Sequence, residues 1–362
     1  MRKPSKRGRE ISDFIIQSIP NHPRDVVNVV SKRFGISRQA VNRYIQELLV
    51  GGYITAEGKT RQRKYSLKVL RENNFTVPLK DLEEDQVWRN EVAPVLKDLP
   101  KNVLNIWHYG FTEMVNNAID HSAGHVLTAF IKMNPLTTRV SVHDDGIGIF
   151  RKIKEECHLE DERHAVLELA KGKLTTDPDK HTGEGIFFAS RMMDYFAILS
   201  GDAYFSHEHG REEDWILERD RPDTGTSVFM DLANKSERTD QEVFNRFASD
   251  EEDYAFTKTV VPVRLARHGA EKLLSRSQAK RLLARVDRFR TVILDFKDVD
   301  SIGRAFSDEI FRVFERNNPR ILLMTTNTVP EVDKMIAIAR GNGKEGAVAT
   351  AANQEEKNVS TV

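Results

Sequence analysis

Residues 107–122 read WHYGFTEMVNNAIDHS, and this stretch decides how the middle of the chain is interpreted. Apolar side chains recur through it at helical spacing, so it is predicted to form an amphipathic helix. Glu113 and Asn117 are four residues apart and project from one face of that helix. A carboxamide oxygen suits a Mg²⁺ ion that bridges phosphates, and a carboxylate one turn away can orient water or a hydroxyl. Taken alone, such a pair is more typical of a solvated helix face.

Two glycine motifs follow this helix along the chain. The strand predicted over residues 139–143 runs into Asp144, and Gly146 and Gly148 come directly after it. An aspartate at the end of a strand can accept the exocyclic amine of adenine, and glycines let the backbone approach the base closely. The second motif, Gly-Glu-Gly at residues 183–185, opens an apolar helix and offers backbone N–H groups to phosphate oxygens. Each glycine pair is weak evidence, but the three elements in this order are specific.

Over about residues 100–232 the chain resembles the GHKL superfamily, which includes the ATP-binding domains of gyrase, heat-shock chaperones, histidine kinases and mismatch-repair proteins. The resemblance implies an α/β sandwich, with helices on one face of a mixed sheet, that binds Mg²⁺ and ATP. It implies Glu113 as the catalytic base and Asn117 as the Mg²⁺ ligand. The cofactor-binding residues that it implies are Asn117, Asp144, Gly146, Gly148, Lys173, Gly183, Gly185 and Thr226. Lys173 would lie in a mobile lid over residues 171–180.

The N-terminal segment differs in charge from the rest of the chain. Residues 1–71 hold 16 Lys and Arg against 5 Asp and Glu (net +11), and the remainder holds 39 against 50 (net −11). Apolar periodicity predicts a helix that ends at Pro20, a second over about 24–34 and a third that Ser37 caps. Two short strands follow, at 53–56 and 64–67. The segment resembles a winged helix-turn-helix domain, which implies binding to double-stranded DNA.

The third predicted helix presents a polar face to the DNA major groove, and the hairpin presents cations to phosphates. The predicted DNA-binding residues are Arg38, Gln39, Asn42, Arg43, Gln46, Lys59, Arg61 and Arg63. Winged helices also serve as protein-docking modules, and that alternative stays open.

Strands and helices alternate again near the C-terminus, which favours a small α/β layer. Residues 292–303, VILDFKDVDSIG, followed by a helix, resemble the STAS-like fold of anti-sigma-factor antagonists. In that family a serine at the start of this helix can be phosphorylated, and Ser301 and Ser307 lie near the corresponding position. The usual Asp-Ser-Ser-Gly order is absent. The other interpretation is that Ser301 caps the helix and that the domain docks a protein partner.

Composition sets the remaining limits. No run approaches the roughly 20 apolar residues that a membrane span needs, so we expect a cytoplasmic protein without membrane contact. The single cysteine, Cys157, excludes an internal disulfide. The predicted α+β multidomain chain has a winged helix-turn-helix (1–71), a connector (72–100), a GHKL domain (101–233), a linker (234–255), a STAS-like domain (256–340) and a disordered tail (341–362).

The predicted function is that of a regulator of transcription or signalling that couples binding or hydrolysis of Mg-ATP to contact with DNA or a partner protein, with a homodimer left open. Two alternatives stay open. In the first, the chain is a protein serine/threonine kinase of the anti-sigma-factor type. In the second, it is an ATPase clamp that resembles the mismatch-repair proteins.

Overall fold

The computed structural model describes residues 5–174, 183–209, 211–248, 256–267 and 272–341. Two compact units account for the fold. The first comprises Met1–Ile147, Met192–Ile198 and Thr224–Asp240, and the second comprises Gly148–Arg191, Leu199–Asp223 and Gln241–Val362. The protein is therefore an α+β chain of several parts, as the sequence predicts. Among the described residues, no helix has both the length and the apolar character needed to cross a bilayer.

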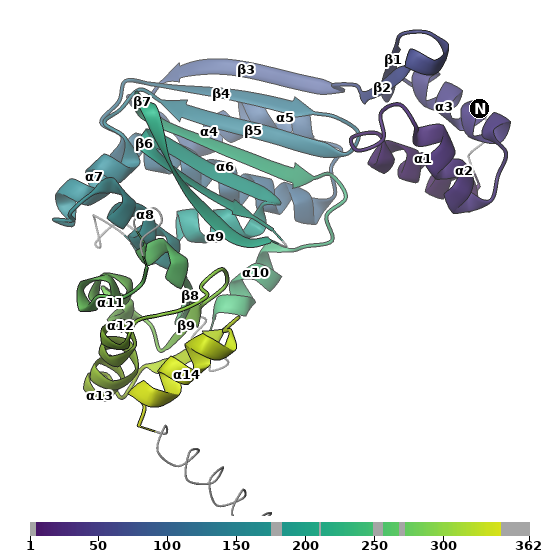
Figure 1. Ribbon diagram of the computed structural model, residues 1–362. Helices are drawn as coiled ribbons and strands as arrows, with labels where there is room; N and C mark the ends of the chain where they lie inside the picture. Colours follow the sequence, from purple (N-terminus) through teal and green to yellow (C-terminus); the bar gives the residue numbers. More distant parts are fainter. Residues whose placement is uncertain (1–4, 175–182, 210, 249–255, 268–271, 342–362) are drawn as a thin grey trace, which may run out of the picture. The chain divides into compact units, whose positions relative to one another are not determined.

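Three helices and a hairpin form the N-terminal part of the first unit (Figure 1). They are α1 (Lys6–Ser18), α2 (Val26–Phe34), α3 (Arg38–Val50), β1 (Ile54–Glu57) and β2 (Lys64–Leu67), with a 3-10 turn at Thr60–Gln62 between the strands. β1 and β2 pair antiparallel. The predicted N-cap of α3 is confirmed, because Ser37 Oγ accepts a hydrogen bond from the Ala40 N–H at 3.2 Å. Apolar side chains from all five elements make one core: Ile11, Ile15, Ile19, Val26, Val30, Val41, Ile45, Leu48, Ile54 and Tyr65.

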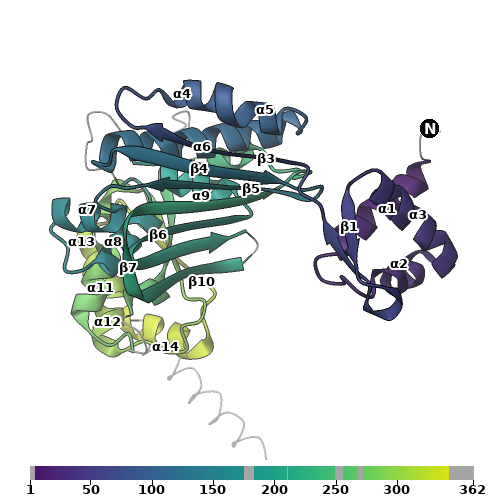
Figure 2. The same ribbon diagram turned by 90° about the horizontal axis from the view of Figure 1, so that it is seen from above.

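A five-stranded sheet has the order β3-β4-β5-β7-β6 and lies largely in the first unit, while the Leu199–Asp223 part of β6 and β7 is counted in the second. Its strands are β3 (Arg71–Pro78), β4 (Val126–Met133), β5 (Thr137–Asp144), β6 (Tyr195–Glu208) and β7 (Arg211–Ala233). The helices α4 (Glu84–Val87), α5 (Ala93–Leu96) and α6 (Lys101–His121) lie on one face of it, as both views show (Figures 1 and 2). A π-helical segment, Trp88–Val92, joins α4 to α5.

The segment predicted as a connector, residues 72–100, belongs to this layer, which corrects that interpretation. β3 pairs antiparallel with β4 along its whole length, from Arg71 opposite Met133 to Pro78 opposite Val126. The pattern of burial along β3 alternates, but polar residues such as Arg71 and Asn73 occupy the half-buried positions. A strand without clean apolar alternation is recognised only through the neighbour with which it pairs.

Most of the second unit consists of helices and a small parallel sheet. α7 (Ile149–Glu156), α8 (Glu162–Lys171) and α9 (Gly185–Met192) come first, and α10 (Asp240–Phe247) lies within the segment predicted as a linker. The strands β8 (Lys258–Pro262), β9 (Thr291–Asp295) and β10 (Leu322–Thr326) pair parallel in the order β10-β9-β8. α11 (Arg276–Leu283), α12 (Arg304–Asp308), α13 (Glu315–Asn317) and α14 (Pro330–Ala339) accompany them, and a π-helical segment, Glu309–Phe314, joins α12 to α13. The predicted tail from 342 onward lies outside the described residues.

The two units divide the predicted domain 101–233 after Ile147. The predicted domain is divided at this point because α8, which follows Ile147, packs with the C-terminal sheet of the second unit. Thr259 Oγ1, on β8, donates a 2.6 Å hydrogen bond to the carbonyl of Lys171, the last residue of α8. The sequence pattern shows where helices and strands form, but it does not show this association across about 90 residues.

Candidate functional site

Asp144 and Thr226 face each other at one end of the sheet, where β5 and β7 pair residue for residue. Asp144 Oδ1 accepts hydrogen bonds from the Gly146 N–H at 2.9 Å and the Thr226 N–H at 3.3 Å, and the Thr226 side chain also hydrogen-bonds the carboxylate. Burial raises the pKa of Asp144 above the ordinary value for an aspartate. The structure therefore brings together two residues, 82 positions apart in sequence, that were predicted to share one ligand.

Gly225 permits this pairing. Its φ is +80°, and a Cβ at this position would lie 1.9 Å from the Asp144 carbonyl oxygen. Any larger residue would push β7 away from the end of β5. The sequence pattern does not single out Gly225, because a lone glycine carries no signal of close approach.

The neighbouring aspartate, Asp145, has a different role. Its Oδ1 accepts the backbone N–H groups of His125 at 2.7 Å and Val126 at 3.0 Å, so the carboxylate holds the start of β4. These hydrogen bonds lower the pKa of Asp145. Of the two adjacent carboxylates, one is half-buried beside Thr226 and the other is an exposed structural acceptor.

The C-terminal end of α6 is held against the turn that follows Asp144. The Ser122 carbonyl accepts the Ile147 N–H at 2.8 Å, and a Cβ on Gly146 would lie 2.1 Å from that same oxygen. Ser122 Oγ donates to the Ala118 carbonyl at 2.6 Å and accepts the Gly124 N–H at 2.9 Å. Sequence reasoning missed Ser122, because a serine just after a helix has many ordinary uses. It ties the helix that carries Asn117 to the turn that carries Gly146.

Glu113 and Asn117 both lie on α6 and are half-buried, as the four-residue spacing predicts. Asn117 Nδ2 is a buried atom with no hydrogen-bond partner among the described residues. A buried amide without a partner is costly, and a ligand group or ion would offset that cost. A flip of the amide about χ2 would present the oxygen instead, so the residue fits the predicted role of Mg²⁺ ligand.

No cluster of three or more His, Cys, Asp or Glu side chains fit for a metal occurs in the described part of the chain. Mg²⁺ is commonly held by one or two protein oxygens together with substrate phosphates and waters, so a single Asn117 oxygen is consistent with it.

The remaining predicted ligands belong to the second unit. Gly148 has φ +88° and stands at the N-cap of α7, and Gly185 begins α9. Gly183 has φ +71°, and its carbonyl accepts the Leu174 N–H at 3.1 Å. Both motifs thus place glycines at the starts of helices, where backbone N–H groups are not used within the helix.

Lys173 is already engaged within its own unit. Its Nζ lies 5.6 Å from the centre of the Phe256 ring and 5.3 Å from that of Phe289, and it donates to the Arg288 carbonyl at 3.4 Å. Burial lowers its pKa, and Arg288 adds to that effect. A phosphate contact through Lys173 would require these interactions to be released.

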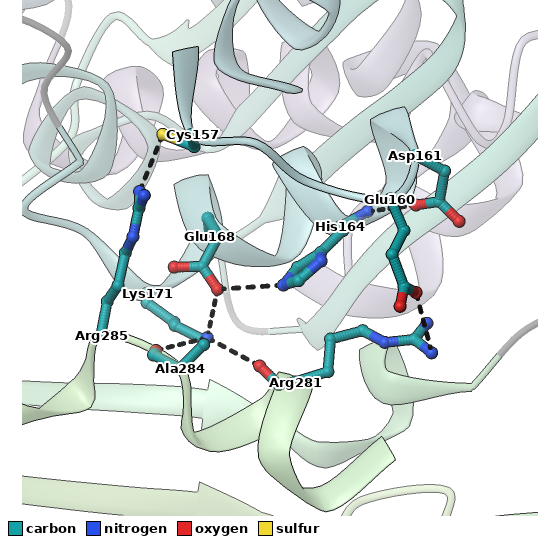
Figure 3. A network of polar contacts seen from close by, with 9 residues as sticks. All are labelled: Cys157, Glu160, Asp161, His164, Glu168, Lys171, Arg281, Ala284 and Arg285. Carbon is teal, nitrogen blue, oxygen red and sulfur yellow. Dashed lines mark hydrogen bonds and ion pairs between the residues drawn. The ribbon is translucent and has the colours of Figure 1, made fainter. Parts of the chain in front are cut away.

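The lid was predicted to begin at Lys171, two residues earlier, and the structure corrects that start. It is the last residue of α8 and is 1% exposed (Figure 3). Its Nζ donates to Glu168 Oε1 at 2.6 Å, to the Ala284 carbonyl at 2.8 Å and to the Arg281 carbonyl at 3.1 Å. All three ammonium N–H groups therefore have acceptors, and two of these are in the C-terminal segment. Residues 175–180 of the predicted lid lie outside the described part.

Glu168 completes this network, which Figure 3 shows between α8 and the end of α11. His164 Nε2 lies 3.5 Å from Glu168 Oε1. Burial alone would raise the pKa of Glu168, but His164 and Lys171 reverse that effect and lower it. The Glu168 carboxylate is thus paired with the buried Lys171 amine at 2.6 Å.

In the N-terminal part, the predicted DNA-binding residues of α3 share one property, which is exposure: Arg38, Gln39, Asn42, Arg43 and Gln46. Lys59 is exposed as well, and Arg63 packs over the Tyr65 ring with its guanidinium carbon 5.4 Å from the ring centre. The position of the Arg61 side chain lies outside the description. The stretch from Lys59 to Arg63 contains the 3-10 turn, so these cations lie in the connection between β1 and β2 and not on the strands.

The two candidate phosphoacceptors differ. Ser301 is exposed, whereas Ser307 is 1% exposed and donates a hydrogen bond to the Arg304 carbonyl. Burial removes Ser307 from the candidates. The alternative role for Ser301 is also corrected, because Gly303 occupies the N-cap of α12 and the Ser301 side chain does not cap it.

Comparison with known proteins supports the C-terminal interpretation. Residues 278–333 match the family model of the STAS-like domain of unknown function (DUF4325). The match covers β9, α12 and β10, so the C-terminal segment contains a STAS-like domain. No curated protein matches the chain.

Proposed function

We propose that the chain is an ATP-binding cytoplasmic regulator, in which a GHKL-type site controls contact with DNA or with a protein partner. The observation that carries the proposal is the cross-strand pair of Asp144 and Thr226 beside Gly146. A half-buried carboxylate with one oxygen fixed by backbone N–H groups is suited to accept an exocyclic amine, and nearby glycine leaves room for a flat base.

Three further features support Mg-ATP as the ligand. The buried amide nitrogen of Asn117 has no partner within the described part of the chain, and Glu113 lies one turn before it on the same helix. Ser122 connects that helix to the turn after Asp144. Gly183 and Gly185 precede and begin a helix, which is where phosphate oxygens bind most readily. When bound, Mg²⁺ would neutralise phosphate charge, and Glu113 would orient water or a hydroxyl.

Replacement of Asp144 by Asn tests this proposal, and the chain provides a matched control in Asp145. We expect Asp144→Asn to weaken ATP binding at least tenfold, because a group that should accept a hydrogen bond becomes able to donate one. Asp145→Asn changes an adjacent carboxylate that holds the start of β4 and lies near the His125 ring, so ATP affinity should change much less. Calorimetry with a non-hydrolysable ATP analogue measures both. Equal affinities for Asp144→Asn and the parent chain would refute the adenine assignment.

A second candidate function, a protein serine/threonine kinase, is favoured by one observation. Ser301 is exposed on the loop before α12 of a domain that matches a STAS-like family. In that case Glu113 would take the proton from a serine hydroxyl as it attacks the γ-phosphate. The ATPase-clamp alternative uses the same carboxylate to orient water.

A further inference from the structure

Lys173 is held by two phenylalanines of the C-terminal segment from Phe256 onward, which contains the matched residues 278–333 and is called the STAS-like segment below. Phe256 precedes β8 and Phe289 precedes β9, and both rings lie within 6 Å of the ammonium. Lys173 and Arg288 also exchange two hydrogen bonds. Lys173 Nζ donates to the Arg288 carbonyl, and Arg288 Nη1 donates to the Lys173 carbonyl at 2.7 Å. The C-terminal segment thus holds both the side chain and the backbone of this one residue.

The hold on Lys173 is much weaker than that on Lys171. Lys171 makes three hydrogen bonds of 3.1 Å or less and is almost completely buried, so its removal would leave Glu168 as an unpaired buried charge. Lys173 is half-buried, and its ammonium has a 3.4 Å hydrogen bond and two ring contacts. Cation–π contacts at such sites contribute modestly. The Lys171 side chain is therefore held firmly in place, whereas the Lys173 side chain can leave its contacts with the STAS-like segment at a smaller cost in free energy.

The backbone around Lys173 is also unusual. Gly172 has φ +80° and Lys173 has φ +53°, the left-handed region that a lysine rarely adopts. The next residue, Leu174, donates its N–H to the carbonyl of Gly183. The STAS-like segment, Lys173 and the glycines proposed to bind phosphate are consequently linked within one unit by consecutive contacts.

We propose that the STAS-like segment inhibits the nucleotide site by capturing Lys173, so that Phe256 and Phe289 compete with ATP phosphate for the same ammonium. This inference rests on the proposed ATP-binding function. Coupling between two binding events is reciprocal. Bound ATP therefore weakens the contact between Lys173 and the STAS-like segment by the same free energy by which that contact weakens ATP binding. A partner that draws the STAS-like segment away would raise ATP affinity.

Phe289→Leu tests the competition, since it removes the ring face but keeps most of the apolar volume. Phe311→Leu is the matched control, because Phe311 is a buried phenylalanine of the same domain that stacks on Phe296 and does not contact Lys173. In the full chain, calorimetry with Mg and a non-hydrolysable ATP analogue should show a three- to tenfold gain in affinity for Phe289→Leu. The control should show no gain. Combining Phe289→Leu with Lys173→Met should abolish the gain.

Hydrogen exchange of the unmodified chain gives a second measurement that does not depend on how the variants fold. Addition of the ATP analogue should speed exchange of amides over residues 286–290. Equal ATP affinity of the parent chain and Phe289→Leu, a gain that persists with Lys173→Met, or unchanged exchange over 286–290 would each overturn the competition alone. Absence of ATP binding in every variant would overturn the proposed function as well.

Discussion

Residues that are neighbours in sequence can have opposite roles because their hydrogen-bond partners differ. Asp144 and Asp145 are identical side chains, yet burial raises the pKa of the first and backbone N–H groups lower that of the second. The sequence predicts a ligand-binding role for Asp144 from its place before a glycine pair, and in the structure Asp144 lies opposite Thr226 on the neighbouring strand. Ser122 and Gly225 could not be predicted, because their importance lies in contacts with distant backbone.

The buried pair of Lys171 and Glu168 leads to a prediction about stability. Lys171→Met should destabilise the chain by about 3–5 kcal/mol, because it leaves the Glu168 carboxylate buried and without its ammonium. The double variant Lys171→Met with Glu168→Leu should recover most of that loss, since neither charge remains. Urea unfolding followed by circular dichroism compares the three proteins. A double variant no more stable than the single one would show that the pair is not held by mutual charge compensation.

At the scale of elements, periodicity predicts most helices and strands, and it fails where polar residues occupy inward positions. The helix containing Glu113 and the strand ending at Asp144 lie close to where the pattern places them, and strands and helices alternate near the C-terminus as predicted. β3 was missed because Arg71 and Asn73 take positions at which an apolar side chain is expected. The π-helical segments at 88–92 and 309–314 carry no distinct sequence signal either.

α3 gives a prediction at this scale, because its outer face is polar and exposed. If the helix enters a DNA groove, Arg43→Ala with Lys59→Ala should weaken binding and reduce the slope of log affinity against log salt by about 2. Fluorescence anisotropy with duplex DNA over a salt series measures both quantities. Arg276→Ala, an exposed arginine on α11, is the control and should change neither. Affinity indifferent to the double change would favour a protein-docking role for the helices.

At the scale of the whole molecule, the presence of a STAS-like domain leads to a prediction about phosphorylation of the chain by its own proposed ATP site. If the chain is a kinase, incubation with Mg and γ-labelled ATP should place acid-stable label on the protein, and Glu113→Ala should abolish it. Ser301→Ala should remove label that resides in this domain, whereas Ser307→Ala should retain it, because the Ser307 hydroxyl is buried. Release of free phosphate without labelled protein would favour the ATPase alternative. Label that survives Ser301→Ala would exclude Ser301 as the acceptor.

The sequence by itself determined the local order of helices and strands, the helix that carries Glu113 and Asn117, and the STAS-like character of the C-terminal segment. The first two follow from periodicity and spacing, which act over a few residues, and the third follows from the resemblance of residues 292–303 to a known family. Tertiary structure alone decided that Asp144 meets Thr226, that β3 joins the sheet and that Lys173 is held by Phe256 and Phe289. Such contacts join residues roughly 50 to 115 positions apart. They depend on which surfaces pack together to bury apolar area, and no local pattern records that choice.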